Sequence, residues 1–517
     1  MNSPPAMATL PWTYRPLTLD AGVRGAFNRT PDKMALREGT RTLTYRQLID
    51  RIDRVGTGAT ADLGLRQGQH AALISTNRLE FIEIVCGLSS VGVAAVMISP
   101  RLAAAEIKFM CDDSRSRVIF VEVQLEEFVR AIKFETVERI IVVGRDYEDW
   151  LARARAVPST VPVQEWEPFS VHYTSGTTGK PKGVVLAHRS RTLLFFAMGV
   201  EYGCYSPDDR AIAVAPLCHG AGFAFAMAPV YFGGFCEILR RFEPDHILSS
   251  IGTAAASNIF LVPTHFHAMF ALEKPILDRY RRGTLKTIIA NAAPLAQATK
   301  EKIVDFFGPG ILNESYGSTE TGIVCNLRPA DQLRKIKCVG QPLPCTEVRI
   351  LDDDGNEVGP DVTGELYSRS EVHFVGYFDR PEETKAAFRG DWFSAGDMAQ
   401  RDEEGYLYIV DRKKDMVISG GLNIYPREIE EVLFTHPAVR EAAVIGVPDD
   451  YWGETLKAFV VLHPGKAPTP EELIEHCRKD LAGYKIPKAV VFIDALPRNT
   501  AGKVLKTTLR AQEATGK

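Results

Sequence analysis

The chain lacks the charge and hydropathy patterns that mark nucleic-acid-binding and membrane proteins. Its 517 residues carry 61 Lys and Arg against 65 Asp and Glu, a net charge of -4, with no block of like charge. Proteins that bind nucleic acids or anionic membranes usually carry clustered positive charge. This chain has none, so we expect neither as its main partner. The most apolar stretches, 211–217 and 223–235, are too short or too often broken by glycine to span a bilayer.

Paired cysteines and a secretory start are also missing. The nine cysteines, an odd number, include no Cys-x-x-Cys pair, which favours free thiols over a disulfide framework or a zinc site. Residues 1–12 contain neither the basic region nor the apolar core of a signal peptide. We therefore expect a cytoplasmic enzyme, as a monomer or a homodimer, and find no internal repeat.

The first 340 residues alternate between two kinds of pattern. Helical spacing occurs at 48–55 and 81–90. Apolar segments typical of buried strands lie between and after these helices, at 70–75, 93–98, 117–123, 139–143 and 287–290. This alternation predicts a mostly parallel sheet covered by helices. The length exceeds what one hydrophobic core fills, so two or more domains are expected.

The pattern changes after about residue 340. Alternating segments at 347–351, 364–369 and 405–410 predict an antiparallel subdomain. A charged link, Asp411–Asp415, precedes about 100 residues with helices predicted at 426–433 and 470–481 and strands at 442–447 and 457–462. The link is either a solvated turn or a hinge. We predict an α/β N-terminal domain at 1–411 (antiparallel from about 340), a hinge at 412–415, and an α+β domain at 416–517.

One run of eleven residues is dense in phosphate-binding chemistry. Residues 173–183 hold three glycines, four Ser or Thr hydroxyls and two lysines. Glycines let backbone N–H groups approach a ligand and form an anion-binding concavity. A Walker A loop has four residues between its first Gly and the Gly-Lys pair, whereas here two separate Gly176 from Gly179-Lys180. Flanking strand-like segments predict a strand–loop–strand setting; a plain surface loop is the alternative.

Four further runs carry candidate ligand-binding groups. In 313–321, Tyr316 can stack a flat ring, and Glu320 offers an oxygen ligand for Mg²⁺. Asp397 follows a small-residue turn and can accept hydrogen bonds from a ribose diol, or it can simply cap that turn. Residues 419–426 form a glycine-containing turn, and Lys503 ends a short loop, where a lone lysine is usually a plain surface charge.

Taken in order from residue 173 to residue 503, these runs resemble the adenylate-forming superfamily. Its members are acyl- and aryl-CoA synthetases, firefly-type luciferases and peptide-synthetase adenylation domains. The resemblance covers nearly the whole chain. It implies a large N-terminal domain of mixed α/β sheets with an antiparallel β subdomain, a hinge, and a small mobile α+β C-terminal domain. It also implies ATP, Mg²⁺ and coenzyme A as ligands, together with a small-molecule carboxylic acid.

The resemblance implies roles for individual residues at the nucleotide. The phosphate-binding loop comprises Thr174, Ser175, Gly176, Thr177, Thr178, Gly179, Lys180 and Lys182. The groups that border adenine and the α-phosphate are Asn313, Tyr316, Gly317 and Thr319, with Glu320 as a metal ligand. Asp397, helped by Arg412, matches the ribose-binding position. Lys503 matches the lysine that bridges the acid's carboxylate and the α-phosphate, and Lys414 matches the hinge position.

The resemblance implies CoA and acyl sites as well. Gly420, Gly421, Trp452 and Tyr484 match the pantetheine tunnel and CoA nucleotide region, although Ile486 stands where some aryl-CoA ligases have a basic residue. Trp452 is equally compatible with core or interdomain packing. His219 matches an aromatic gate beside the acyl pocket, whose other walls are Phe223, Thr264, His265, Asn291, Ala292, Ala293 and Ile323. Asn291 replaces the usual glycine, which favours a compact or partly polar acid over a long alkyl chain.

We therefore predict an AMP-forming acid–CoA ligase. Adenylation of a carboxylate would release pyrophosphate, and transfer to the CoA thiol would release AMP. One alternative is a stand-alone adenylation enzyme that loads a carrier protein; the lack of a carrier domain after Lys503 favours free CoA. A second alternative, from another class, is a nucleotide-binding regulator without turnover. The combined presence of Glu320, Asp397 and Lys503 argues against it.

Overall fold

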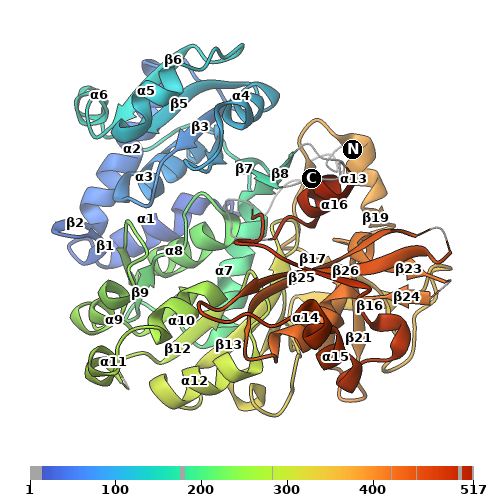
Figure 1. The fold of residues 1–517 in the computed structure, drawn as a ribbon. Helices are drawn as coiled ribbons and strands as arrows, with labels where there is room; N and C mark the ends of the chain where they lie inside the picture. Colours follow the sequence, from blue (N-terminus) through green and yellow to red (C-terminus); the bar gives the residue numbers. More distant parts are fainter. Residues whose placement is uncertain are drawn as a thin grey trace. The chain divides into compact units, whose positions relative to one another are not determined.

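The computed structural model describes residues 14–174, 181–281, 283–420, 422–449, 451–498 and 504–514 (Figure 1). The chain forms two compact units. The first comprises residues 1–334, 342–346 and 370–386, and the second comprises 335–341, 347–369 and 387–517. The predicted hinge at 412–415 lies inside the second unit, and the predicted domain boundary at this hinge stays a prediction.

The first unit contains a seven-stranded sheet that carries the base of the glycine-rich loop. Its strands, in spatial order, are β18 (Gly376–Tyr377), β8 (Lys182–Ala187), β7 (Pro168–Thr174), β4 (Ala94–Ile98), β3 (His70–Ile74), β5 (Ser116–Glu122) and β6 (Arg139–Val143). The strands from β7 to β6 are parallel, whereas β8 is antiparallel to both β7 and β18. The predicted strand–loop–strand setting is therefore confirmed.

A nine-stranded sheet forms the rest of the β structure of this unit. Its strands, in spatial order, are β15 (Gln341–Pro342), β14 (Gly322–Leu327), β13 (Leu312–Ser318), β12 (Thr287–Ala290), β11 (Asn258–Leu261), β9 (Arg210–Ala213), β10 (Phe235–Ile238), β1 (Met34–Glu38) and β2 (Arg41–Thr44). The strands from β13 to β1 are parallel, and the β13–β14 and β1–β2 pairs are antiparallel. The prediction of a mostly parallel, helix-covered architecture is confirmed.

Helices cover these sheets because their apolar faces need a partner. They are α1 (Leu19–Arg29), α2 (Tyr45–Ala61), α3 (Leu79–Ser89), α4 (Ala104–Asp113), α5 (Glu126–Arg130), α6 (Tyr147–Arg153), α7 (His188–Tyr202), α8 (Gly220–Phe232), α9 (Pro244–Thr253), α10 (Pro263–Phe270), α11 (Lys274–Tyr280), α12 (Gln297–Phe307) and α13 (Pro381–Ala386). Helix α2 begins with a capping box, in which Thr44 and Gln47 satisfy each other's backbone N–H groups. No helix within the described ranges is long and apolar enough to cross a membrane.

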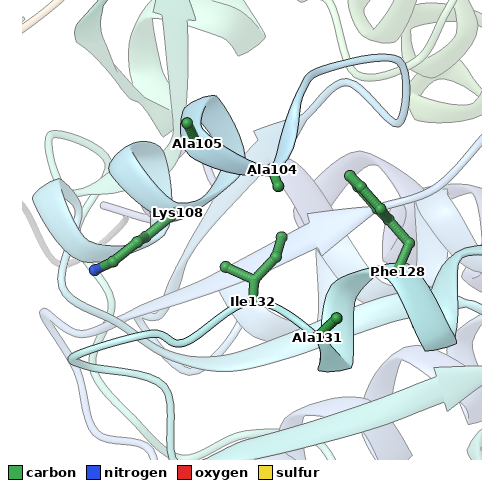
Figure 2. A pocket seen from close by; sticks show the side chains of 6 residues that line it. All are labelled: Ala104, Ala105, Lys108, Phe128, Ala131 and Ile132. Carbon is green, nitrogen blue, oxygen red and sulfur yellow. The ribbon is translucent and has the colours of Figure 1, made fainter.

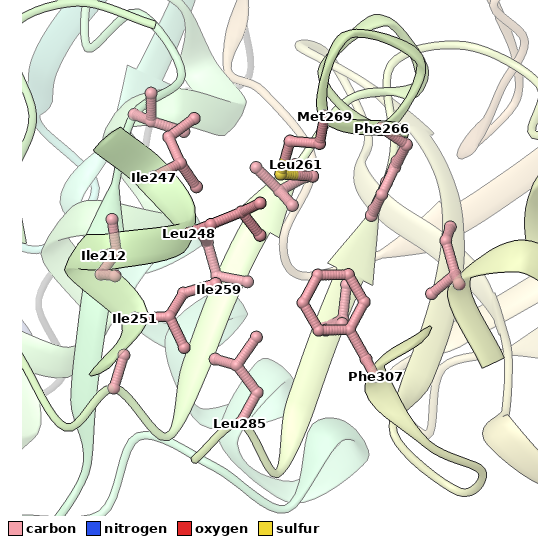
Figure 3. Close-up of a cluster of buried hydrophobic side chains, with 14 of the residues drawn as sticks. Ile212, Ile247, Leu248, Ile251, Ile259, Leu261, Phe266, Met269, Leu285 and Phe307 are labelled. Carbon is pink, nitrogen blue, oxygen red and sulfur yellow. The ribbon is translucent and has the colours of Figure 1, made fainter. Parts of the chain in front are cut away.

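A hydrophobic cluster anchors the end of β12 and the start of β13. It is formed by buried side chains of α9, α10 and α12 together with those of β11 and β12. Figure 3 shows part of it, with Leu248 of α9 close to Ile259 of β11. Ala290, Leu295 and Leu312 belong to the same cluster, so the chain segments on both sides of 291–294 are anchored.

The second unit is built from two sheets. A six-stranded sheet contains β19 (Phe388–Arg389), β20 (Trp392–Phe393), β17 (Gly364–Ser370), β21 (Asp397–Arg401), β22 (Leu407–Arg412) and, paired with β17, β16 (Thr346–Leu351). Its pairs β17–β20, β17–β21, β19–β20 and β21–β22 are antiparallel, as predicted for this part of the chain.

The C-terminal part of the second unit has its own sheet and helices. The strands are β24 (Leu422–Ile424), β23 (Val417–Ser419), β26 (Gly453–Leu462), β25 (Val439–Asp449) and β27 (Ala489–Phe492), and the helices are α14 (Pro426–Phe434), α15 (Pro470–Asp480) and α16 (Lys506–Ala514). A hydrophobic core lies between this sheet and α14 and α15. The helices and strands predicted for 426–481 are confirmed.

Candidate active site

The turn between β13 and β14 holds Thr319 and Glu320. The two strands are antiparallel, with Ser318 opposite Gly322, so the chain reverses over residues 319–321. The Ser318 N–H donates to the Thr321 hydroxyl at 2.9 Å and closes the turn. A Cβ atom at Gly317 would lie 1.9 Å from the carbonyl oxygen of Gly322, so only glycine fits there. The turn is therefore tightly closed at its base.

Arg191 of α7 holds this turn in place. Its guanidinium is buried and donates to the carbonyl oxygen of Thr319 at 2.6 Å and to that of Val372 at 3.3 Å. Burial lowers the pKa of Arg191 to about 10, and the nearby charge of Glu320 opposes this shift. The group therefore stays cationic at neutral pH. The sequence alone does not single out Arg191, because it lies outside every motif.

The carboxylate of Glu320 is oriented by Tyr377, whose hydroxyl donates to Oε1 at 3.1 Å. The backbone carbonyl of Glu320 accepts the N–H of Phe374 at 2.7 Å. Within the described ranges, no three His, Cys, Asp or Glu side chains come together as a metal cluster. Mg²⁺ commonly binds one or two carboxylates together with water and substrate phosphates, so the single carboxylate of Glu320 fits this ion.

Tyr377 also contacts the base of the glycine-rich loop. Thr174 and Lys182 face each other as the last β7 and first β8 residues, and the Lys182 ammonium lies 5.0 Å from the centre of the Tyr377 ring. Lys182 forms an ion pair with Glu383 of α13. The structure thus brings Lys182 and Glu320 to the same tyrosine. The other loop residues, Ser175, Gly176, Thr177, Thr178, Gly179 and Lys180, lie outside the described residues.

Asn313 and Tyr316, two of the residues predicted to border adenine and the α-phosphate, lie on β13 but on opposite faces of it. Asn313 is buried, and its Oδ1 accepts a hydrogen bond from Asn326 at 3.0 Å. Tyr316 is only half-buried. Side chains alternate along a strand, so Asn313 and Tyr316 point to opposite faces of β13. Their predicted contacts with the nucleotide stay predictions.

His219 precedes α8, close to the Thr319 turn. A Cβ atom at the next residue, Gly220, would lie 3.6 Å from the Thr319 side chain. The Nε2 atom of His219 is buried without a hydrogen-bond partner among the described residues. Burial, and then the charge of Arg101, lower the pKa of His219. The imidazole is therefore held neutral beside the turn that carries Glu320.

His172 is a second buried imidazole that the sequence motifs do not identify. It lies on β7, and neither ring nitrogen has a hydrogen-bond partner among the described residues. Burial lowers its pKa to about 3, with further lowering by the charges of Arg191 and His219, while the backbone of Cys218 partly opposes this shift. His172 therefore lies as a neutral ring near both Arg191 and His219.

The remaining predicted acyl-pocket residues fall into three environments. Phe223 is buried in an aromatic cluster, 6.0 Å from Phe169 between ring centres, and Ile323 is buried as well. His265 stacks on Phe242 with ring centres 4.3 Å apart, and burial lowers its pKa to about 4. Thr264 is exposed.

The segment 291–293 has an unusual backbone. Ala292 has a φ of 76°, in the left-handed region that non-glycine residues rarely adopt. The buried side chain of Asn291 accepts the N–H of Ala292 through Oδ1, while Ala292 and Ala293 are exposed. The side chain that replaces the family's usual glycine therefore supports a strained turn.

A separate apolar groove lies on the first unit. It is lined by α4 and the end of α5, as Figure 2 shows, with Ala104, Ala105, Lys108, Phe128, Ala131 and Ile132 around it. None of the predicted site residues within the described ranges lines this groove. It is therefore not the candidate active site.

In the second unit, Asp397 and Arg412 meet across β21 and β22. They are directly opposite in the strand register, and the Arg412 guanidinium lies 2.9 Å from the Asp397 carboxylate. Lys414 follows in a short 3₁₀ turn, Lys413–Asp415. Burial, and then the charge of Arg412, lower the pKa of Lys414. The predicted ribose and hinge residues thus lie in one short segment.

The predicted CoA-site residues Gly420 and Trp452 are in contact. The Gly420 N–H donates to the Trp452 carbonyl at 2.8 Å, and a Cβ atom at Gly420 would lie 2.7 Å from the indole. Trp452 is 43% exposed and Tyr484 is 48% exposed, so core packing does not account for either ring. Gly421 and Lys503 lie outside the described residues.

Comparison with protein families matches most of the chain. The AMP-binding enzyme family matches residues 23–378, and the AMP-binding enzyme C-terminal domain matches residues 428–503. Among curated proteins, the chain is 35% identical to a feruloyl-CoA synthase of Amycolatopsis sp over 93% of its own length and 96% of the relative's. It is 34% identical to a 2-succinylbenzoate–CoA ligase of Geobacillus kaustophilus, over 93% and 95% of the two chains.

Solved structures of similar proteins share the fold over almost their whole length. ATP-bound MatB from Rhodopseudomonas palustris matches with a TM-score of 0.89 at 29% identity, covering 97% of this chain and 100% of that one. The o-succinylbenzoate CoA synthetase of Bacillus subtilis, in complex with its acyl-adenylate intermediate, matches with a TM-score of 0.86 at 30% identity, over 96% and 98%.

Proposed function

Because the chain belongs to the AMP-binding enzymes of the adenylate-forming superfamily, we propose that it joins a carboxylic acid to CoA in two AMP-forming steps. Named relatives are acid–CoA ligases, and the chain is an acid–thiol ligase of this kind. The observation that carries the two-step proposal is the turn holding Glu320, which Arg191 holds in place and Tyr377 joins to the base of the glycine-rich loop.

In the first proposed step, an oxygen of the acid's carboxylate attacks the α-phosphorus of ATP. A new oxygen–phosphorus bond forms, the bond to the β-phosphate bridge breaks, and pyrophosphate leaves with the electron pair. Two anions approach each other, so positive charge must offset their repulsion. Mg²⁺, when bound, supplies such charge at the phosphates.

This chain's own residues supply the rest of that environment. Lys180, Lys182 and the loop N–H groups would hold the leaving phosphates, and Lys503 would bridge the carboxylate and the α-phosphate. Loss of one such electrostatic contact typically lowers the rate about 10²–10³-fold. Asp397 would accept hydrogen bonds from the ribose hydroxyls, and Tyr316 would stack on adenine. A carboxylate nucleophile needs no general base.

In the second proposed step, the CoA thiol loses its proton to water and attacks the acyl carbonyl of the acyl-adenylate as the thiolate. The carbon–sulfur bond forms, the acyl carbon–oxygen bond breaks, and AMP leaves with that oxygen and its electron pair. Gly420 and Gly421 would line the pantetheine path, and the exposed indole of Trp452 would stack on the adenine of CoA. The hinge at 412–415 would turn the C-terminal domain between the two steps.

For the acid, we propose a compact or partly polar compound. His265 keeps a neutral ring at the predicted pocket, with Nδ1 accepting the Val262 N–H at 3.4 Å, so that Nε2–H remains a donor. Asn291 adds bulk where the family usually has glycine. The names of two relatives, a feruloyl-CoA synthase and a 2-succinylbenzoate–CoA ligase, also refer to acids with polar substituents.

A carrier-protein thiol is the second candidate acceptor. A fatty acid–[acyl-carrier-protein] ligase of Streptomyces coeruleorubidus is 33% identical over 91% of this chain. Both acceptors present the same phosphopantetheine thiol, so the first half-reaction is common to them. The acceptor alone distinguishes the two proposals.

The test is pyrophosphate release across a panel of acids, measured with and without CoA. The panel comprises ferulate, 2-succinylbenzoate, anthranilate, octanoate and palmitate. We expect acid-dependent pyrophosphate release and, with CoA, a stoichiometric acyl-CoA product for one of the compact acids. Efficient turnover of palmitate alone would overturn the substrate proposal. Acylation of a carrier protein but not of CoA would favour the second acceptor, and no acid-dependent release would favour a non-catalytic regulator.

A further inference from the structure

A buried ion pair lies directly behind the strained segment 291–294. Lys300 of α12 is 1% exposed, and its ammonium pairs with Oε2 of Glu314, a buried residue of β13. Burying two charges is costly, and an apolar pair of the same volume is often as stable. Stability alone is therefore a weak explanation for this pair.

The second oxygen of Glu314 holds the backbone of the neighbouring loop. The N–H of Leu295 donates to Oε1 of Glu314 at 3.1 Å. In the parallel pairing of β12 and β13, Ala290 lies opposite Glu314. The carboxylate thus closes the loop that leaves β12 at Ala290 and returns to the core at Leu295, and both ends of this loop are buried in the cluster of Figure 3.

The loop needs such a constraint because its backbone is strained. The φ of 76° at Ala292 is unfavourable for a residue with a Cβ atom. Such conformations persist only where the surroundings determine them, and they gather at functional sites. Two contacts supply the constraint here: Asn291 accepts the N–H of Ala292, and Glu314 accepts the N–H of Leu295.

The same strand also carries the nucleotide residues. Glu314 and Tyr316 are two positions apart on β13, so their side chains share one face of the strand. The Thr319–Glu320 turn follows at the end of β13. Glu314 thus connects the strand that leads to this turn with the segment 291–294.

We propose that Glu314, with its charge compensated by Lys300, is a positioning residue that sets the 291–294 wall of the acyl pocket against Tyr316 and thereby determines which acids are adenylated. The inference rests on the proposed function, since it needs an acid at this wall. Neither side chain touches substrate in this account. Their effect is on the fit of the acid, not on the binding of ATP.

Two double variants test whether residue 314 positions the loop through its hydrogen bond to Leu295 or only helps to stabilise the fold. Lys300→Met/Glu314→Gln removes both charges and keeps an oxygen to accept the Leu295 N–H. Lys300→Met/Glu314→Met removes both charges and that acceptor. The control is Lys302→Met, an exposed lysine on the same helix. For each protein, the KM for ATP, the KM for the best acid and the ratio of kcat/KM between the two best acids are measured by pyrophosphate release.

We expect the Gln variant to keep the wild-type acid selectivity. The Met/Met variant should raise the KM for the acid and change the selectivity ratio by about tenfold or more, with the KM for ATP within about twofold of wild type. Equal selectivity in the two double variants would overturn the positioning role. If the Met/Met protein does not fold, Glu314→Asp, which keeps the charge but withdraws the carboxylate, must give the same change in selectivity.

Failure of the proposed function has a different signature. A wild-type protein that releases no acid-dependent pyrophosphate with any acid contradicts the ligase proposal itself, and the positioning role with it. An active wild type whose Met/Met and Glu314→Asp variants keep full selectivity contradicts the positioning role alone.

Discussion

Replacing Arg191 with methionine tests whether the Glu320 turn is held for catalysis. The guanidinium makes two hydrogen bonds to backbone carbonyls, at 2.6 and 3.3 Å, each of a kind that contributes about 1.5–3 kcal/mol. Burial of the charged guanidinium opposes this stabilisation. It lowers the pKa of Arg191 to about 10, and this pKa shift corresponds to a cost of roughly 3 kcal/mol. The two bonds together contribute about 3–6 kcal/mol, so the two effects partly cancel and the free energy of unfolding should fall by no more than about 3 kcal/mol.

Activity should fall even in protein that remains folded. Without Arg191, the Thr319 carbonyl loses its donor and Glu320 loses a nearby positive charge, so we expect the rate of pyrophosphate release to fall about 10²-fold. The assay is acid-dependent pyrophosphate release, paired with urea unfolding of the same protein. Arg189→Met, on the same helix but bound to Glu165, is the control. A variant that retains wild-type activity, or one that loses activity only in proportion to unfolded protein, would refute the reasoning.

Three further predictions address other parts of the account. Lys503→Ala should nearly abolish adenylation but spare thiol transfer from supplied acyl-AMP; equal loss in the two half-reactions would contradict its assignment. Gly420→Ala should raise the KM for CoA while leaving pyrophosphate release intact, because a Cβ atom would lie 2.7 Å from Trp452 at a φ of 57°. His172→Gln should flatten the pH dependence of unfolding. In the unfolded chain, His172 binds a proton below about pH 6.5, whereas in the folded protein it stays neutral down to about pH 3. The free energy of unfolding of the wild type therefore falls as the pH drops through this window. His172 contributes at most about 1.4 kcal/mol per pH unit to this fall.

The sequence predicts those parts of the site that lie in contiguous motifs. The glycine-rich loop, the 313–321 run and the alternation of strands and helices are local patterns, and the predicted strand–loop–strand setting follows from residues next to each other. Arg191 and Tyr377 are different, because they meet the Glu320 turn from positions 128 and 57 residues away in the chain. No local pattern marks them, so only the folded arrangement identifies them.

The strained segment 291–294 shows a second limit of sequence reasoning. The replacement of glycine by Asn291 is visible in the sequence, and it suggests extra bulk in the acyl pocket. The structure instead shows the Asn291 side chain folded onto the N–H of Ala292, with Glu314 and Lys300 behind the loop. Backbone conformation and buried charge pairs depend on the packing of distant elements, which residue patterns do not report.

The most direct test of the proposed chemistry follows one oxygen atom. The acid that gives the highest rate is labelled with ¹⁸O in its carboxylate and converted with ATP and CoA. If the carboxylate attacks the α-phosphorus and the thiol later breaks the acyl carbon–oxygen bond, one labelled oxygen must appear in AMP, and the pyrophosphate must be unlabelled. Label in inorganic phosphate with ADP as the product, or AMP without label, would contradict the account.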